Sequence, residues 1–199
     1  MPVSAARRLR LGERLVNLNR SLHSMTPPQH GAHKNLIAGL LRRYAVERED
    51  RPMQAALASV AGDWHAGTTF GLLERSRELA LRMAIATLFG GDDEGAHLAR
   101  LLQTYFFLRR EVTSPLVVHD ETARSALRRA GRAADAALRS FIRRIRLYGT
   151  TQTGLFASIV TAGSEDGYAF SEDEIAGHLN ILFVSTTEPI AITLTWTLL

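Results

Sequence analysis

Long segments with helical spacing of apolar residues dominate this sequence. The clearest runs from Leu72 to Phe89, contains no glycine or proline, and is followed by Gly90 and Gly91, which suit a helix C-terminus. Apolar residues at three- and four-residue steps predict two more helices, Ala96 to Glu111 and Thr122 to Leu147. No segment combines sustained alternation of apolar and polar residues with hairpin turns. The sequence therefore predicts a mainly α fold.

A fourth helix is expected from Ser171 towards Leu199. Ser171 followed by Glu174 has the spacing of a capping box, in which two side chains satisfy amides of the first turn. From Glu174 to Pro189 the segment is nearly uncharged and apolar all round, which is typical of a buried helix. The sequence stops within this apolar run without a polar cap. We therefore expect the chain to be a fragment of something longer.

Glu188 and Pro189 interrupt this apolar helix. Burial of a carboxylate costs several kcal/mol unless the group is paired, hydrogen-bonded or protonated. Proline has no N–H to donate to the Ser185 carbonyl, and inside a helix it typically costs about 3 kcal/mol. An acid beside a missing backbone hydrogen bond indicates a ligand or proton-relay site. The structural alternative is a kinked core helix whose Glu188 reaches solvent.

Composition narrows the function classes. With 46% apolar and 22% charged residues, the 199-residue chain resembles an ordinary soluble domain. It has no cysteine, so it cannot by itself supply a disulfide, a zinc finger, an iron–sulfur cluster or a thiolate ligand for haem. No apolar run reaches the roughly 18 residues of a membrane span. We expect no transmembrane segment and a cytoplasmic location.

Several weaker patterns have ordinary structural explanations. The net charge of +4 is too small to indicate nucleic acid, and the arginine-rich segment Arg124 to Arg146 is expected to be a solvated helix face. His30 and His33 have a spacing that metal ligands use, but no further ligand lies close by in the sequence. Glu74 and Arg77 are expected to form a solvated ion pair within one helix.

Three patterns in order resemble one family. Ser185 lies three residues before the acid Glu188, and Lys34 follows His30 by four residues ahead of an apolar run. Between them comes a segment from Trp64 to Gly67, followed by the helix that ends at Gly90. These patterns resemble the I helix, the C helix and the D-to-E segment of the cytochromes P-450, the haem-thiolate monooxygenases.

The resemblance implies one partial domain over residues 1–199. Residues 10–90 correspond to a C-to-E region, 91–170 to a variable helical region, and 171–199 to an I helix. The fold class expected is a partial, mainly α cytochrome P-450-like fold, truncated at both ends. The cysteine region that binds haem iron in the family lies beyond the matched part, so this chain is not expected to be active alone.

The resemblance also assigns roles to individual residues. His30 and Lys34 are implied to bind the haem propionates, with lysine where the family usually has arginine. Glu188 is implied to relay protons, with hydroxyl help from Ser185 or Thr187. Pro189 replaces the threonine that normally serves this relay. A parent enzyme that uses peroxide, or that rearranges an already oxygenated substrate, is therefore the alternative.

The implied function is oxidation of a small apolar molecule by a haem enzyme. Haem is the implied cofactor, and electrons are implied to come from a ferredoxin- or flavoprotein-type partner, with no nucleic acid involved. The rival interpretation is a non-enzymatic helical module that binds an apolar ligand or a partner helix through its C-terminal segment.

Overall fold

The computed structural model describes residues 12–47, 51–62, 64–113, 120–149, 154–162 and 169–199. These residues contain no extended β-strand, which confirms the mainly α prediction. The helical elements are α2 (Glu13–Leu18), the 3-10 helix η1 (Leu22–Ser24), α3 (Gln29–Glu47), α4 (Arg51–Ala61), α5 (Leu72–Leu88), α6 (Asp93–Val112), α7 (Glu121–Tyr148), α8 (Leu155–Thr161) and α9 (Glu172–Leu198).

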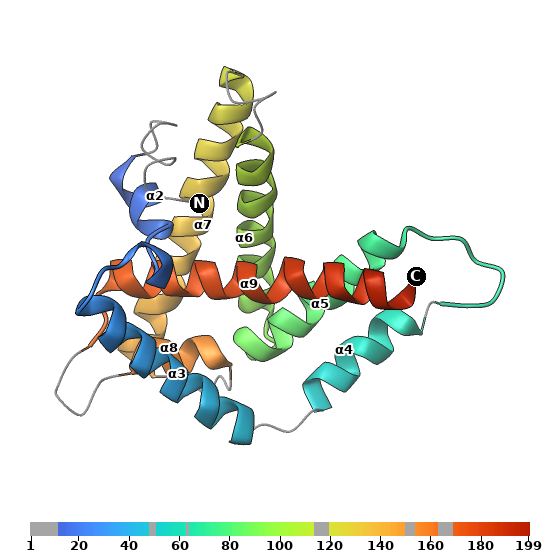
Figure 1. The fold of residues 1–199 in the computed structure, drawn as a ribbon, viewed down its shortest axis with the longest axis horizontal. Coiled ribbons are helices and arrows are strands. Elements are labelled where there is room, and N and C mark those ends of the chain that lie inside the picture. The colour runs from blue at the N-terminus through green and yellow to red at the C-terminus, as the bar shows by residue number, and fades with distance from the viewer. Residues whose placement is uncertain (1–11, 48–50, 63, 114–119, 150–153, 163–168) are drawn as a thin grey trace.

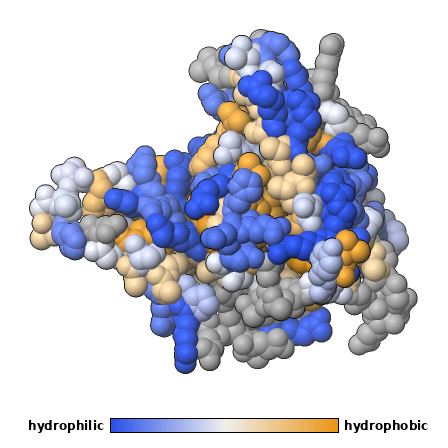
Figure 2. All heavy atoms as spheres, turned by 180° about the vertical axis from the view of Figure 1, so that it is seen from behind, coloured by the Kyte–Doolittle hydropathy of each residue, from blue (hydrophilic) through white to orange (hydrophobic). Residues whose placement is uncertain are grey.

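The longest axis of the structure follows α9. This helix crosses the front of the molecule and packs chiefly against α5 and α2, with further contacts to α6, α7 and α8 (Figure 1). α6 and α7 stand side by side and extend away from α9, whereas α3 and α8 lie below one of its ends. α4 packs against α5 near the other end. On the opposite side of the molecule, hydrophilic side chains cover most of the surface around smaller hydrophobic patches (Figure 2).

Local signals in the sequence determine where these helices begin and end. After α5 the chain turns through Gly90 and Gly91, whose φ angles of 84° and 86° are readily reached only by glycine. The predicted capping box forms at the start of α9. The Glu174 amide donates to Ser171 Oγ at 3.3 Å, and the Ser171 amide donates to Glu174 Oε2 at 2.8 Å.

Aromatic side chains fill the centre of the core, where α9 meets α5, α7 and α8. Phe89 lies just after α5, and its ring centroid is 4.7 Å from that of Phe156, 6.0 Å from that of Phe141 and 6.2 Å from that of Phe183. All four side chains are buried. Each contributes about 1.5–3 kcal/mol through burial of its apolar surface, so this cluster fixes how the four helices pack.

α9 continues through Pro189 to Leu198, so the proline does not end the helix. Its 27 residues and its composition make it long and apolar enough to cross a membrane, although only 22% of its most apolar window is buried in the fold. Length and composition alone do not make α9 a membrane span, because the core helix of a soluble protein can pass the same test, so the expectation of no transmembrane segment stays a prediction. The helix includes Glu174 and Glu188, whose side chains the structure pairs with residues of other helices.

Gly177 allows the chain that follows α2 to lie directly against α9. A Cβ atom at this position would lie 1.8 Å from the carbonyl oxygen of Arg20 and 3.2 Å from that of Asn17. Both neighbours are backbone atoms and cannot rotate away as a flexible side chain would. The close crossing of these two segments therefore requires glycine at position 177.

We expect Gly177→Ala to lower the free energy of unfolding by about 1–3 kcal/mol, because the added methyl group overpacks the crossing. Gly39→Ala is the matched control, since Gly39 lies within α3 and a Cβ there meets nothing within 4 Å. The control should gain about 0.5–1 kcal/mol from the lower backbone entropy of alanine in a helix. Urea unfolding followed by circular dichroism measures both. Equal effects of the two substitutions would contradict the close crossing.

Candidate functional site

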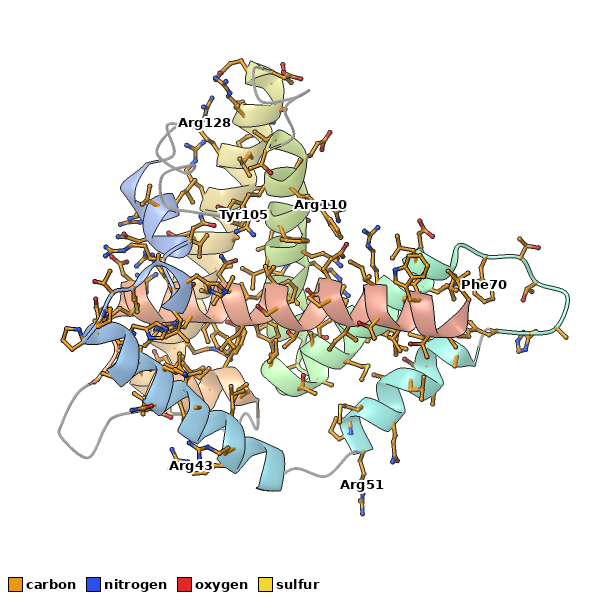
Figure 3. The ribbon with its side chains drawn as sticks, viewed as in Figure 1. Arg43, Arg51, Phe70, Tyr105, Arg110 and Arg128 are labelled. Atoms are coloured by element: carbon orange, nitrogen blue, oxygen red, sulfur yellow. The ribbon has the colours of Figure 1, made fainter. Side chains whose placement is uncertain are left out.

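The acid of α9 is bound by two arginines from neighbouring helices. Arg77 of α5 makes two hydrogen bonds to Glu188, from Nε to Oε2 at 3.1 Å and from Nη2 to Oε1 at 2.7 Å. Arg110 of α6 donates from Nη1 to Oε1 at 3.0 Å. Figure 3 shows Arg110 projecting from α6 towards the middle of α9. Glu188 thus joins three helices that are far apart in the sequence.

The two arginines differ in exposure. The side chains of Glu188 and Arg77 are 10% and 27% exposed, whereas that of Arg110 is 61% exposed. The Arg77 guanidinium also lies 5.1 Å from the centroid of the Phe107 ring, a cation–π distance. Its hydrogen bonds to Glu188 raise the pKa of Arg77 above its usual value. Arg77 is therefore the fixed partner of the carboxylate, and Arg110 is the solvent-facing one.

This arrangement corrects two expectations. Arg77 was expected to form a solvated pair with Glu74, but it reaches across to α9 instead, because a buried carboxylate attracts the nearest cation. The alternative in which Glu188 reaches solvent is also wrong, since the residue is only 8% exposed. The burial argument indicated that Glu188 needs a partner. The spacing of residues along the chain could not indicate that the partner is Arg77.

Ser185 and Thr187, the hydroxyl residues suggested as helpers of Glu188, have different surroundings. Thr187 is buried, and its hydroxyl donates to the Phe183 carbonyl at 2.9 Å, as threonine often does within a helix. Ser185 is exposed on the face of α9 that also carries Pro189 and Ile192. Among the described residues, neither hydroxyl is hydrogen-bonded to Glu188. The relay therefore stays a prediction.

His30 and Lys34 lie four residues apart on α3, as the resemblance implied. Lys34 is exposed and His30 is half-buried. His33, which lies between them, has an unexpected role: it is fully buried and contacts His178 of α9. A signal for this was present, because His33, Ile37 and Leu40 follow the spacing of one buried helix face.

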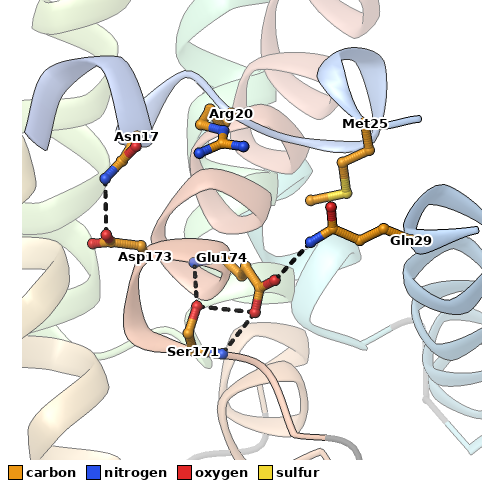
Figure 4. Close-up of a pocket in the computed structure, with 7 residues that line it drawn as sticks. All are labelled: Asn17, Arg20, Met25, Gln29, Ser171, Asp173 and Glu174. Carbon is orange, nitrogen blue, oxygen red and sulfur yellow. Dashed lines mark hydrogen bonds between the residues drawn. The ribbon is translucent and has the colours of Figure 1, made fainter. Parts of the chain in front are cut away.

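Near the start of α9, Glu174 lines a small polar pocket. The pocket has a volume of about 210 Å³ and lies between α9, the segment after α2 and the start of α3 (Figure 4). Its lining residues are Asn17, Arg20, Met25, Gln29, Ser171, Asp173 and Glu174. Within the part of the chain that the structure describes, no group of three or more histidine, cysteine or acidic side chains is arranged to hold a metal ion.

The arginine-rich face of α7 is not wholly exposed to solvent. Arg139 is only 8% exposed and is surrounded by acids. Its guanidinium contacts Asp135 at 3.0 Å, Glu172 at 3.2 Å and Asp173 at 2.6 Å. The expectation of a solvated face is therefore wrong for Arg139, because the acidic first turn of α9 packs against this part of α7. This arginine stabilises the fold and is not free to contact nucleic acid.

Comparison with known proteins identifies distant relatives. No protein-family model matches the chain. The chain is 28% identical over 178 residues to proteins of Mycobacterium bovis and Mycobacterium tuberculosis that are provisionally named cytochrome P-450 135B1. The matched region covers 85% of this chain and 37% of the length of each relative. These matches support a distant relationship to the cytochromes P-450.

We expect Glu188→Gln to lower the free energy of unfolding by about 2 kcal/mol. Loss of a partner in a buried ion pair costs about 3–5 kcal/mol, and the partial exposure of Arg77 reduces that cost. Arg110→Gln should cost less than about 1 kcal/mol, because this arginine is mostly solvated. Urea unfolding of the two variants at pH 7 measures the difference. Unchanged stability of Glu188→Gln would exclude a structural role for the pair.

Proposed function

We propose that this chain forms a helical part of a haem-dependent monooxygenase that oxidises a small apolar molecule. One observation carries the proposal. A long helix holds an acid at its middle through two arginines, while the adjacent turn presents Ser185, Pro189 and Ile192 outwards. The distant mycobacterial relatives support the same assignment. Because the chain spans 37% of their length, the activity is proposed for a complete protein and not for these residues alone.

The residues of this chain fit part of a haem site. Lys34 is exposed on α3, so its ammonium group is available to hold a propionate, and His30 lies one turn before it. The outward face of α9, with its small and apolar residues, offers a surface on which a flat apolar ring can lie. No cysteine is present to bind the iron. When bound, haem supplies oxygen activation, and an axial thiolate from elsewhere would promote it.

Glu188 is proposed to hold and transfer protons at the carboxylate oxygen that Arg110 contacts. Arg77 keeps the carboxylate in place through two hydrogen bonds, whereas the exposed Arg110 can exchange its contact for water. Oε1 keeps its 2.7 Å hydrogen bond from Arg77 Nη2, and water that takes the place of Arg110 Nη1 on this oxygen delivers the proton there. Ser185, one turn before the exposed Pro189, is better placed to pass a proton outwards than the buried Thr187.

The remaining parts of this function are proposed on the resemblance. Electrons would come from a ferredoxin- or flavoprotein-type partner, and the complete protein would be cytoplasmic. The alternative is an enzyme that uses peroxide or rearranges an already oxygenated substrate. Such an enzyme would not need the proton relay through Glu188. The pairing of Glu188 with Arg77 and Arg110 favours α9 as a core helix over a membrane span, because the pairing commits its middle to α5 and α6.

A second candidate function rests on the exposed end of α9. Beyond Ala191 this helix exposes large apolar side chains, among them Ile192, Trp196 and Leu198. Such a surface also suits a non-enzymatic module that binds an apolar ligand or a partner helix. Haem binding separates the two candidates, because only the first requires it.

A chimera tests the proposal. This chain replaces the matched segment of the M. tuberculosis relative, and haem content and the reduced carbon-monoxide spectrum are measured against the unmodified relative. We expect the chimera to retain haem and to give a thiolate-type spectrum. The 199-residue chain alone should give none, because it has no cysteine. A folded, helical chimera without haem would contradict the proposal.

Within the chimera, Lys34→Ala tests the propionate contact. We expect it to weaken haem retention by about 1.5–3 kcal/mol, the usual contribution of a hydrogen bond to a charged group. Arg100→Ala is the matched control, since Arg100 is an exposed cation on α6. Transfer of haem to apomyoglobin measures retention. Equal transfer rates for the two variants would remove Lys34 from the proposed site.

A further inference from the structure

Three titratable side chains connect α3 to the first turns of α9. His33 Nδ1 lies 2.8 Å from His178 Nε2, and His33 Nε2 lies 3.4 Å from Glu174 Oε1. Both histidines are fully buried. The Phe170 ring packs against the two imidazoles, with centroid distances of 5.0 Å and 5.1 Å. The contact between the two rings is therefore made without solvent.

Hydrogen bonding determines which nitrogens carry protons when both rings are neutral. Only one proton fits between His33 Nδ1 and His178 Nε2. If His33 Nδ1 carried it, the bare Nε2 lone pair would face the Glu174 carboxylate. We therefore assign the proton to His178 Nε2, which donates to His33 Nδ1, while His33 Nε2–H points to Glu174. His178 Nδ1 is then a bare acceptor, and it is buried without a partner among the described residues.

Protonation of both rings would break the hydrogen bond between His33 and His178. With both rings charged, an N–H of each ring would face the other across 2.8 Å, and the hydrogen bond would be lost. Charging of either ring also buries a cation. The ring contact is therefore compatible with neutral pH and is weakened by acid.

Charged groups near the pair are few within the described part of the chain. Glu174 faces it from α9, with 22% of its side chain exposed, and Arg20 lines the same pocket as Glu174 from the segment after α2. The neighbouring Asp173 is directed to Arg139 of α7. α8, which packs on α3, has no titratable side chain between Leu155 and Thr161. Among the described residues, Glu174 is the carboxylate that contacts the pair.

Burial, with the nearby His33 as a second cause, lowers the pKa of His178 from 6.5 to about 4, while Glu174 opposes the shift. Burial also lowers the pKa of His33, against the opposing effect of Glu174. Between pH 6.5 and about 4 the unfolded chain therefore binds more protons than the folded one. The stability contributed by the pair is complete above pH 6.5 and is lost as the pH falls towards 4.

We propose that the Glu174–His33–His178 chain is a pH-sensitive contact that fixes α3 against α9 at neutral pH and releases it in acid. α3 carries His30 and Lys34 on its outer side, so the contact also sets the position of the candidate propionate-binding residues. Only this last consequence rests on the proposed function. The release of α3 requires neither haem nor a role for His30 and Lys34.

Hydrogen exchange of the unmodified 199-residue chain tests the proposal. The measured rates are corrected for the intrinsic exchange rate, which gives an opening constant for the amides of α3. As the pH falls from 6.5 to 5, we expect this constant to rise about tenfold per pH unit for each proton that the histidines take up on opening. Amides of α6 and α7, which pack against each other away from α3, should change much less. A pH-independent opening constant for α3 would overturn the proposal.

Two substitutions separate titration from simple packing. Glu174→Gln keeps a capping residue at the start of α9 but removes the carboxylate that raises the pKa of both histidines. Without this carboxylate the folded pair binds a proton less readily and His33 loses its partner, so the opening constant of α3 should rise and the release should move to higher pH. His178→Gln provides an amide donor that does not titrate, so the pH dependence of α3 should flatten. His97→Gln, at an exposed histidine on α6, is the matched control and should leave the release unchanged.

The possible results separate the pH-sensitive contact from the proposed haem binding. If Glu174→Gln leaves the release midpoint unchanged or moves it to lower pH, the pH-sensitive contact is wrong. If His178→Gln fails to fold, nitrogen-15 titration of the histidines in the unmodified chain decides, and two pKa values near 6.5 would refute the contact. An intact acid release in a chimera that does not bind haem would reject the haem proposal alone.

Discussion

Burial of the first half of α9 is the constraint on which the rest of the structure depends. From Ile175 to Asn180 every residue of this helix is buried, so the helix needs neighbours on all sides. α5, α2, α7 and α8 supply them, and the glycine at position 177 permits the nearest approach. The first half is therefore the centre of the fold. The second half carries an exposed face, on which the candidate site is built.

Polar groups buried along α9 are satisfied by residues of other helices. Asn180 Nδ2 donates to the Leu18 carbonyl at 2.9 Å, and Glu188 is bound by Arg77 and Arg110. Because an unpaired polar group inside a protein costs free energy, each contact also specifies which helix lies beside α9 at that level. The apolar core supplies most of the stability, and these polar contacts restrict the arrangement of the helices.

Two polar contacts join α9 to its neighbours through different chemistry. Glu188 lies ten residues after His178, about 15 Å along the helix, and its partners are arginines that stay protonated at any pH relevant to the cell. His178 has a second histidine as its partner, and that contact depends on both rings remaining neutral. One helix thus combines an ion pair with two arginines at its middle and a contact between two neutral histidines near its start.

The sequence by itself determined the helical class, the ends of α5 and the start of α9, because apolar spacing, Gly90 and Gly91, and the Ser171–Glu174 capping box act between residues close in the chain. It also indicated that a buried Glu188 requires a partner. Only the tertiary structure decided that the partner is Arg77, that His33 and not His30 points inwards, and that Arg139 is buried. Each of these depends on helices that are distant in sequence, and the pattern along one chain does not specify which of their faces meet.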